Sequence, residues 1–216
     1  MTYDPLGRVI DTVDPLTHTT HSDYDALGRP ITVTMNYVSG GPLDNQTNLR
    51  TVTQYDAASN RVKVTDPKGI AAQFQYDLLN RLVTVTDALA GTTRYGYDAA
   101  SNLLTITDAN THTITHTYDL LNRLLSMTDP LTHTTVYTYD IANRLINVGG
   151  QAYSWDNNGN LLADGVFTYT YDAANRPITI KQGTTLTYTY NYNGLGDRFK
   201  QVVNGVPTTY TLDLNA

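Results

Sequence analysis

The chain has 216 residues, a formal net charge of −6 and no cysteine, and all 20 of its acidic residues are aspartates. The missing cysteine excludes disulfide bonds and thiolate metal sites, and the lack of a basic stripe argues against nucleic acid or anionic lipid as a partner. Seventeen tyrosines, abundant threonine and few lysines favour strands over helices. No apolar run approaches the roughly 20 residues of a membrane-spanning helix.

A Tyr-Asp pair recurs along the chain, and residues 118–138 form one complete period of 21 residues. The spacing lengthens to 31 between Tyr24 and Tyr55 and shortens to 16 on either side of Trp155. Trp155-Asp156 and Tyr192-Asn193 are degenerate copies. Because the first copy begins at residue 3, we expect the sequence to be a piece of a longer array. The complete pairs begin at Tyr3, Tyr24, Tyr55, Tyr76, Tyr97, Tyr118, Tyr139 and Tyr171.

Each period contains two turn signals separated by strand signals. Four residues after the tyrosine stands Gly, Asn or Ser, which adopt left-handed backbone or build turns, and the next residue is most often Arg. An alternating run with apolar residues such as Val83 and Val85 follows, and Thr-Asp-Pro, as at residues 128–130, marks the second turn. Two antiparallel strands per period over about nine periods predict about 18 strands.

The second strand of a period carries an aromatic residue two positions before the tyrosine, which places both rings on one side of the sheet. We expect stacked repeats to bring these pairs together, each aromatic pair contributing about 0.5–1.5 kcal/mol beyond burial. We also expect the apolar residues of the first strand to face the side opposite the tyrosines, although turn geometry decides this parity. The added aromatic residues are Phe74, Tyr95, Tyr137, Tyr153, Tyr169 and Tyr190.

Two interruptions break the period. The insertion at about residues 36–50 contains Gly40-Gly41-Pro42 and predicts a longer loop inside the array, not a domain boundary. From about residue 149 the repeats shorten, and Gly149-Gly150, Asp164-Gly165 and Asn204-Gly205 predict two-residue hairpin turns.

The predicted fold is all-β: a single repeat array over residues 1–216, in which tandem antiparallel hairpins form one long sheet. No helix is available to cover a face, and open twisted sheets rarely exceed about ten strands without curling. We therefore expect a curved sheet, with a change of strand length or curvature near residue 149.

The period Tyr-Asp-x-x-[Gly/Asn]-Arg-Leu-x-x-Val-Thr-Asp closely resembles the YD repeat of Rhs proteins, toxin-complex C subunits and teneurins, over essentially the whole chain. The resemblance implies a segment of a hollow β-shell, which in bacterial members encloses a C-terminal toxin. In teneurins the shell belongs to an adhesion receptor, and YD repeats are linked to carbohydrate binding. Residues 210–215 resemble the stretch just before the Rhs core, but the core, its self-cleaving aspartyl site and the toxin have no counterpart in this sequence.

The resemblance assigns a structural role to the residues that match the repeat motif. They are Tyr3, Asp4, Gly7, Arg8, Tyr24, Asp25, Gly28, Arg29, Tyr55, Asp56, Tyr76, Asp77, Asn80, Arg81, Tyr97, Asp98, Tyr118, Asp119, Asn122, Arg123, Tyr139, Asp140, Asn143, Arg144, Tyr171, Asp172, Asn175 and Arg176.

The repeated polar residues allow other functional interpretations. His112 and His133 occupy equivalent positions in neighbouring repeats and could bind a metal or act as a pH switch, as could His18, but an exposed strand start is the simpler interpretation. The repeated aspartates could bind calcium, yet aspartate at a turn start normally accepts backbone N–H groups. The arginines are expected to pair with the aspartate of the same turn, as surface pairs of about 0.2–1 kcal/mol. We predict no catalytic residue, no metal and no cofactor.

The sequence therefore favours a non-catalytic shell segment of a larger, secreted or cell-surface polypeptide, which encapsulates or displays a C-terminal effector. The expected partners are further YD repeats and the effector, with no nucleic acid and no membrane insertion. A carbohydrate-binding adhesion module is the alternative, because tyrosines can stack on sugar rings. An enzyme is a third class, for which uniform repeats offer no cleft.

Overall fold

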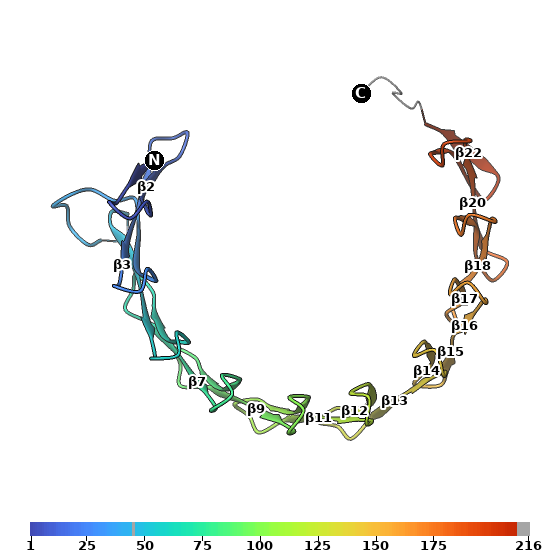
Figure 1. Cartoon of the computed structure of the whole chain (residues 1–216), viewed down its shortest axis with the longest axis horizontal. Helices are drawn as coiled ribbons and strands as arrows, with labels where there is room; N and C mark the ends of the chain where they lie inside the picture. The colour runs from blue at the N-terminus through green and yellow to red at the C-terminus, as the bar shows by residue number, and fades with distance from the viewer. Residues whose placement is uncertain (45, 211–216) are drawn as a thin grey trace. The chain divides into compact units, whose positions relative to one another are not determined.

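A computed structural model describes residues 1–44 and 46–210, in which every regular element is a β-strand (Figure 1). Strands that follow one another in sequence pair antiparallel, within a sheet of 15 strands and a sheet of seven. Interresidue contacts divide the chain into two compact units, Met1–His116 and Thr117–Ala216. No helix in the described part of the chain is long and apolar enough to cross a membrane.

The 15-stranded sheet contains β1 (Thr2–Tyr3), β2 (Val9–Val13), β3 (Thr19–Tyr24), β4 (Pro30–Met35), β5 (Leu49–Tyr55), β6 (Arg61–Thr65), β7 (Ala71–Tyr76), β8 (Leu82–Thr86), β9 (Thr92–Tyr97), β10 (Leu103–Thr107), β11 (Thr113–Tyr118), β12 (Leu124–Thr128), β13 (Thr134–Tyr139), β14 (Leu145–Val148) and β15 (Gln151–Ala152). The seven-stranded sheet contains β16 (Ser154–Trp155), β17 (Leu161–Ala163), β18 (Thr168–Tyr171), β19 (Pro177–Gln182), β20 (Leu186–Tyr192), β21 (Arg198–Val203) and β22 (Val206–Thr209).

The all-β prediction is confirmed, but the predicted strand number is too low. Ten turns that follow a tyrosine or Trp155 are each flanked by two strands, and β15 and β22 bring the described total to 22. β15 is separate because the ladder stops at Tyr153, between β15 and β16. Near residue 149, where the sequence predicts a change of strand length or curvature, β14 to β17 have four, two, two and three residues, and the ladder breaks between β15 and β16.

Cross-strand pairs show which side chains share a face. Phe74 on β7 lies directly opposite Val85 on β8, and Tyr169 on β18 lies opposite Ile180 on β19. Directly opposed residues of antiparallel strands point to the same side. The expectation of opposite faces is therefore wrong, because a β-bulge after each tyrosine turn adds one residue and shifts the register, as between Gln75 and Tyr76.

The sheet has no second layer in the described residues. No hydrophobic side chain there is fully buried, and the buried residues are Thr32, Thr34 and Asn48. Large apolar side chains at turn tips, such as Leu78 and Ile141, are fully exposed. Order in the sheet therefore depends on backbone ladders and cross-strand pairs instead of on a packed core.

Two of the three hairpin turns predicted in the C-terminal part of the chain are present where the sequence places them. Gly149-Gly150 and Asn204-Gly205 each form two-residue turns with positive φ at both residues. The third turn lies one residue later than predicted, because its two central residues are Gly165 and Val166 and not Asp164 and Gly165. Asp164 instead flanks the turn, and its Oδ1 accepts the N–H groups of Val166 and Phe167.

The insertion connects two paired strands. β4 pairs directly with β5, so the ladder continues past the loop, and Leu49 and Arg50 belong to β5 and not to the loop. Asn48 closes the loop. Its Oδ1 accepts the Val38 N–H at 2.8 Å and its Nδ2 donates to the carbonyls of Val38 and Pro42. Of the C-terminal stretch compared with the Rhs core, residues 211–215 lie outside the described residues.

A glycine substitution tests the strain at one turn. Ala90 has φ of 65° in the turn between β8 and β9, a conformation that costs an L-residue about 1–2 kcal/mol. We expect Ala90→Gly to stabilise the chain by about 0.5–1 kcal/mol after the entropy of the unfolded chain is subtracted, measured by urea unfolding.

Ala142 provides the matched control, since it also lies in a turn but without positive φ. Ala142→Gly should leave stability unchanged or lower it. Equal effects of the two substitutions would contradict the strain at Ala90.

Candidate functional site

The repeated motif residues gather at two sets of turns. First-row turns begin one residue after the tyrosine or tryptophan, and second-row turns join the other ends of the strands. First-row turns begin at Asp4, Asp25, Asp56, Asp77, Asp98, Asp119, Asp140, Asp156, Asp172 and Asn193, and second-row turns with the same geometry begin at Asp14, Asp66, Asp87, Asp108 and Asp129.

Each first-row turn is closed by its first residue. In the turn Asp25–Arg29, the Asp25 N–H donates to the Arg29 carbonyl at 3.0 Å, and the Gly28 N–H donates to the Asp25 carbonyl. Asp25 Oδ1 accepts the N–H groups of Leu27 and Arg29 at 2.9 and 3.0 Å. The aspartate thus satisfies donors that the tight turn leaves without a ladder partner.

The fourth residue of every first-row turn has positive φ, as the sequence predicts. Glycine adopts this backbone without penalty, and asparagine tolerates it better than most residues do. These residues, with φ between 59° and 97°, are Gly7, Gly28, Ser59, Asn80, Ser101, Asn122, Asn143, Gly159, Asn175 and Gly196.

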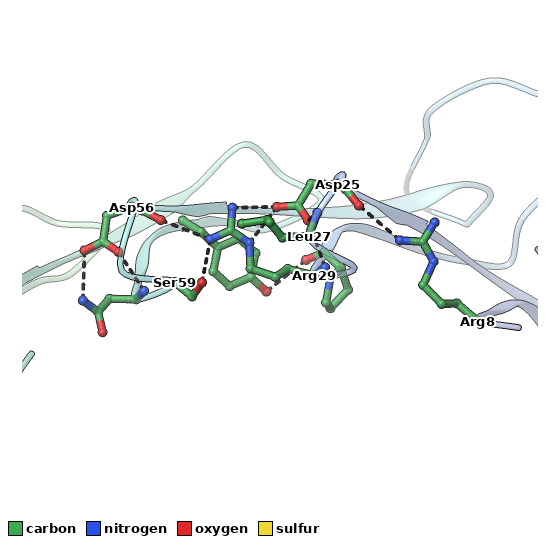
Figure 2. A network of polar contacts seen from close by, with 9 residues as sticks. Arg8, Asp25, Leu27, Arg29, Asp56 and Ser59 are labelled. Carbon is green, nitrogen blue, oxygen red and sulfur yellow. Dashed lines mark hydrogen bonds and ion pairs between the residues drawn. The ribbon is translucent and has the colours of Figure 1, made fainter. Parts of the chain in front are cut away.

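The arginine links its own turn to the next one (Figure 2). Arg29 Nε donates to Asp25 Oδ2 at 2.7 Å, and Arg29 Nη1 donates to the Asp56 carbonyl at 3.1 Å and to Ser59 Oγ at 3.0 Å. Arg8 makes the equivalent contact with the Asp25 carbonyl. The predicted Asp–Arg pairing is present, but the Arg29 and Asp25 side chains are only 22% and 20% exposed, so the pair is better shielded than an ordinary surface pair.

The tyrosine of the next repeat packs under this arginine. The Arg29 guanidinium carbon lies 4.7 Å from the centre of the Tyr55 ring, a cation–π distance. The Tyr55 hydroxyl donates to the Pro30 carbonyl at 3.0 Å, at the bulged start of β4. The same hydroxyl contact recurs at Tyr24, Tyr76, Tyr97, Tyr139 and Tyr192, and the Trp155 indole N–H replaces it once.

Along the first-row turns, the arginine of one repeat therefore lies over the tyrosine of the next, as in the pairs Arg8–Tyr24, Arg81–Tyr97 and Arg176–Tyr192. The described ring pair with nearly parallel planes in the C-terminal unit, Tyr188 and Tyr190, lies within one strand. A guanidinium fits between turns because its planar fork can donate to the aspartate and to the next turn at once.

Copies that depart from the motif keep its contacts. Where Asn replaces Arg, Asn60 Nδ2 donates to Asp56 Oδ2 at 3.0 Å and to Asn80 Oδ1 at 2.9 Å. In the last copy the two roles are exchanged, since Asn193 stands at the turn start and its Nδ2 donates to Asp197. A donor and an acceptor at these two positions are thus enough to close the turn.

The histidines of the second-row turns occupy the place of the arginine. His18, His112 and His133 each have Nδ1 about 3 Å from Oδ2 of the aspartate that begins the same turn. Their side chains are 54%, 61% and 76% exposed. No group of three or more potential metal ligands exists in residues 1–44 and 46–210.

Sequence reasoning missed a further polar cluster around His21. Its Nδ1 lies 2.6 Å from Asp11 Oδ1, and its ring stacks on Tyr37 at 4.4 Å. Asp11 and His21 are direct cross-strand partners. The available signal was that both residues depart from the repeat at positions that face each other across a hairpin.

Hydrogen bonding shifts the acidity of the turn aspartates. The backbone N–H of Arg81 is the largest cause that holds the pKa of Asp77 below its ordinary value of 3.8. Partial desolvation opposes it, and the Arg81 side chain adds to the lowering. The backbone N–H of Arg144 likewise leads the lowering of the pKa of Asp140. The folded turns therefore favour the ionised form of these carboxyl groups.

A pair of tyrosines tests the hydroxyl contact. Tyr97 donates to the Leu82 carbonyl at 2.9 Å, whereas the hydroxyl of Tyr95, two residues earlier, makes no hydrogen bond in the described residues. We expect Tyr97→Phe to destabilise the chain by about 1 kcal/mol and Tyr95→Phe to be nearly neutral in urea unfolding. A neutral Tyr97→Phe would contradict a stabilising role for this contact.

The lowered aspartate pKa values predict acid sensitivity. A carboxyl whose pKa is lower in the folded than in the unfolded chain stabilises the fold above about pH 3.8 and loses that contribution as the pH falls through the folded pKa. We expect the urea midpoint to fall between about pH 5 and pH 2.5.

Asp77→Asn should make this pH dependence shallower, since asparagine keeps an acceptor oxygen at the turn start without titrating. An unchanged slope would show that Asp77 does not contribute to it.

Comparisons with known proteins agree with this geometry. The family model described as Teneurin YD-shell matches residues 43–205, and the model described as RHS Repeat matches residues 3–40. The crystal structure of TcdB2-TccC3-Cdc42 is similar with a TM-score of 0.59 and 17% identity, over 94% of this chain and 13% of that one. The Tc holotoxin pore of Photorhabdus luminescens is similar with a TM-score of 0.57 and 16% identity, over 97% and 14%.

A curated relative, the tRNA nuclease WapA of Bacillus subtilis (strain 168), is 41% identical over 68 residues, which are 31% of this chain and 3% of that protein. The structural neighbours, at below 25% identity, show a shared fold, and the chain spans a small part of the length of each relative named here. Because the YD-shell model matches well over half of the sequence, the chain belongs to the teneurin YD-shell family.

Proposed function

We propose that residues 1–216 form one YD-repeat array that builds part of the wall of a shell in a larger polypeptide. The shell encloses or displays a C-terminal effector, and the polypeptide is secreted or lies at the cell surface. The partners of this chain are further repeats of the same polypeptide and the effector.

The observation that carries this proposal is the single-layered sheet without buried hydrophobic side chains in its described residues. A face that combines apolar and aromatic residues, and turn tips such as Leu120 that are fully exposed, leave apolar surface uncovered. Isolated soluble domains rarely leave such surface contiguous. Neighbouring repeats and an enclosed segment would cover it.

In this proposal the motif residues hold the turns and strands together and take no part in catalysis. The aspartates close their turns, five of the arginines also donate to the next turn, and six of the tyrosines donate to a backbone carbonyl of the preceding repeat. Because these contacts repeat with nearly the same geometry, none of the turns stands out as a reaction centre. The relative named as a tRNA nuclease matches over only 3% of its length, so its activity is not transferred to this chain.

The first test compares the isolated chain with the longer reading-frame product. We expect the isolated 216 residues to self-associate or to unfold with low cooperativity, because the two sheets offer unpaired edge strands and no packed core. Sedimentation velocity and urea unfolding measure both properties. A monomer with a sharp cooperative transition would contradict the wall assignment.

Enclosure is tested separately, by limited proteolysis of the longer product. The segment that follows the repeats should resist protease in the intact product and be digested when it is expressed alone. Cleavage of that segment at equal rates in both forms would rule out enclosure while leaving the wall assignment intact.

A carbohydrate-binding surface is the second candidate. The rings of Tyr188 and Tyr190 on β20 are stacked, with centres 6.4 Å apart and planes 7° from parallel, and an aromatic ring face can pack against a sugar ring. Binding on a glycan array that is lost in a Tyr188→Ala, Tyr190→Ala double variant would support this candidate, and an array without hits would exclude it.

A further inference from the structure

The insertion lines a cavity together with the start of β5. The cavity has a volume of about 540 Å³, within the range of about 300–1,000 Å³ that is typical of small-molecule sites. Its walls combine apolar with charged side chains. The lining residues are Leu43, Asp44, Asn48, Leu49, Arg50, Asp66, Pro67 and Lys68.

Two neighbouring pieces of the N-terminal unit form these walls. Leu49 and Arg50 begin β5, while residues 66–68 belong to the second-row turn that joins β6 to β7. Val52 pairs with Thr65, so the start of β5 runs beside this turn. The insertion contributes Leu43 and Asp44.

The loop is held in place by asparagine contacts. Asn48 is 6% exposed and has φ of 54°, and its backbone N–H donates to the Asn36 carbonyl at 3.0 Å. Asn36 Nδ2 in turn donates to the Gln46 carbonyl at 3.0 Å. Together with the bonds from Asn48 to Val38 and Pro42, these contacts tie both ends of the loop to each other and preform the cavity.

The two cations of the cavity, like the other lysines and arginines outside the first-row turns, form no ion pair in the described residues. Six arginines form ion pairs with turn aspartates, but neither Arg50 nor Lys68 forms an ion pair or a side-chain hydrogen bond in the described residues. Each of the two carboxylates of the cavity has one oxygen that accepts hydrogen bonds from its own turn. Asp66 Oδ1 accepts two backbone N–H groups at 2.8 Å, and Asp44 Oδ1 likewise accepts two.

We propose that this cavity binds a small organic acid with an apolar body and one carboxylate. The apolar body packs against Leu43, Leu49 and Pro67. The carboxylate lies between Arg50 and Lys68, whose donors it satisfies with charge-assisted hydrogen bonds. This site is independent of the shell role and of the repeat motif residues.

The test uses sodium 4-phenylbutyrate as the probe and the full 216-residue chain. Saturation-transfer NMR detects binding and calorimetry gives the affinity, and both work whether the chain is monomeric or self-associated. We expect saturable binding of phenylbutyrate. The matched compounds 4-phenylbutan-1-ol and 4-phenylbutylamine, which lack the anion, should bind at least about fivefold more weakly.

Variants locate the probe. Arg50→Gln and Lys68→Gln should each weaken phenylbutyrate binding about five- to tenfold, while Arg94→Gln, an arginine outside the cavity, should not. Leu43→Asp, at a 70% exposed loop side chain that the sheet does not need, should abolish binding. Circular dichroism confirms that each variant keeps its strands. Equal binding of the amine, or unchanged affinity in the Arg50, Lys68 and Leu43 variants, would overturn the proposal.

Discussion

The structure depends on one contact more than on any other: the carboxylate that closes a first-row turn and also holds the arginine that reaches the next turn. A sheet of one layer has no core to bring its strands into register. The Asp25 carboxylate accepts two backbone N–H groups within its turn. Arg29 connects this turn to the next one by donating to the Asp56 carbonyl and to Ser59 Oγ. Since Tyr55 lies under Arg29, the turn, the ion pair and the ring form one unit that is repeated along the edge.

This arrangement explains why the motif tolerates exchange at some positions. Asn60 replaces an arginine because an amide can still donate to the aspartate and to the neighbouring turn. Asn193 and Asp197 exchange donor and acceptor without loss of the bond. Trp155 replaces a tyrosine because the indole N–H reaches the same type of carbonyl at 2.7 Å. The physical requirement at each position is a donor or an acceptor of suitable length, so residue identity can vary while the contact stays.

The charged side chains have different partners where the insertion interrupts the repeat. Where the period holds, the arginines of the described first-row turns pair with the aspartate of their own turn. Where the period is broken between β4 and β5, the loop folds back on Asn48, and Arg50 and Lys68 line a cavity without ion-pair partners in the described residues. We therefore propose that chemistry specific to this chain lies in the insertion and that its repeats serve assembly.

The sequence by itself determined the all-β class, the positions of the first-row turns and the positive φ of their fourth residues, because a period of 21 residues with aspartate, glycine and asparagine at constant places leaves few other local structures. It also predicted the Asp–Arg pairs. Only the tertiary structure decided that aromatic and apolar residues share a face, since a β-bulge at each tyrosine shifts the register by one residue. Three further features depend on which strands lie side by side, and the spacing of residues along the chain does not reveal this. They are the contact of Arg29 with the next turn, the His21–Asp11 pair and the cavity at Arg50.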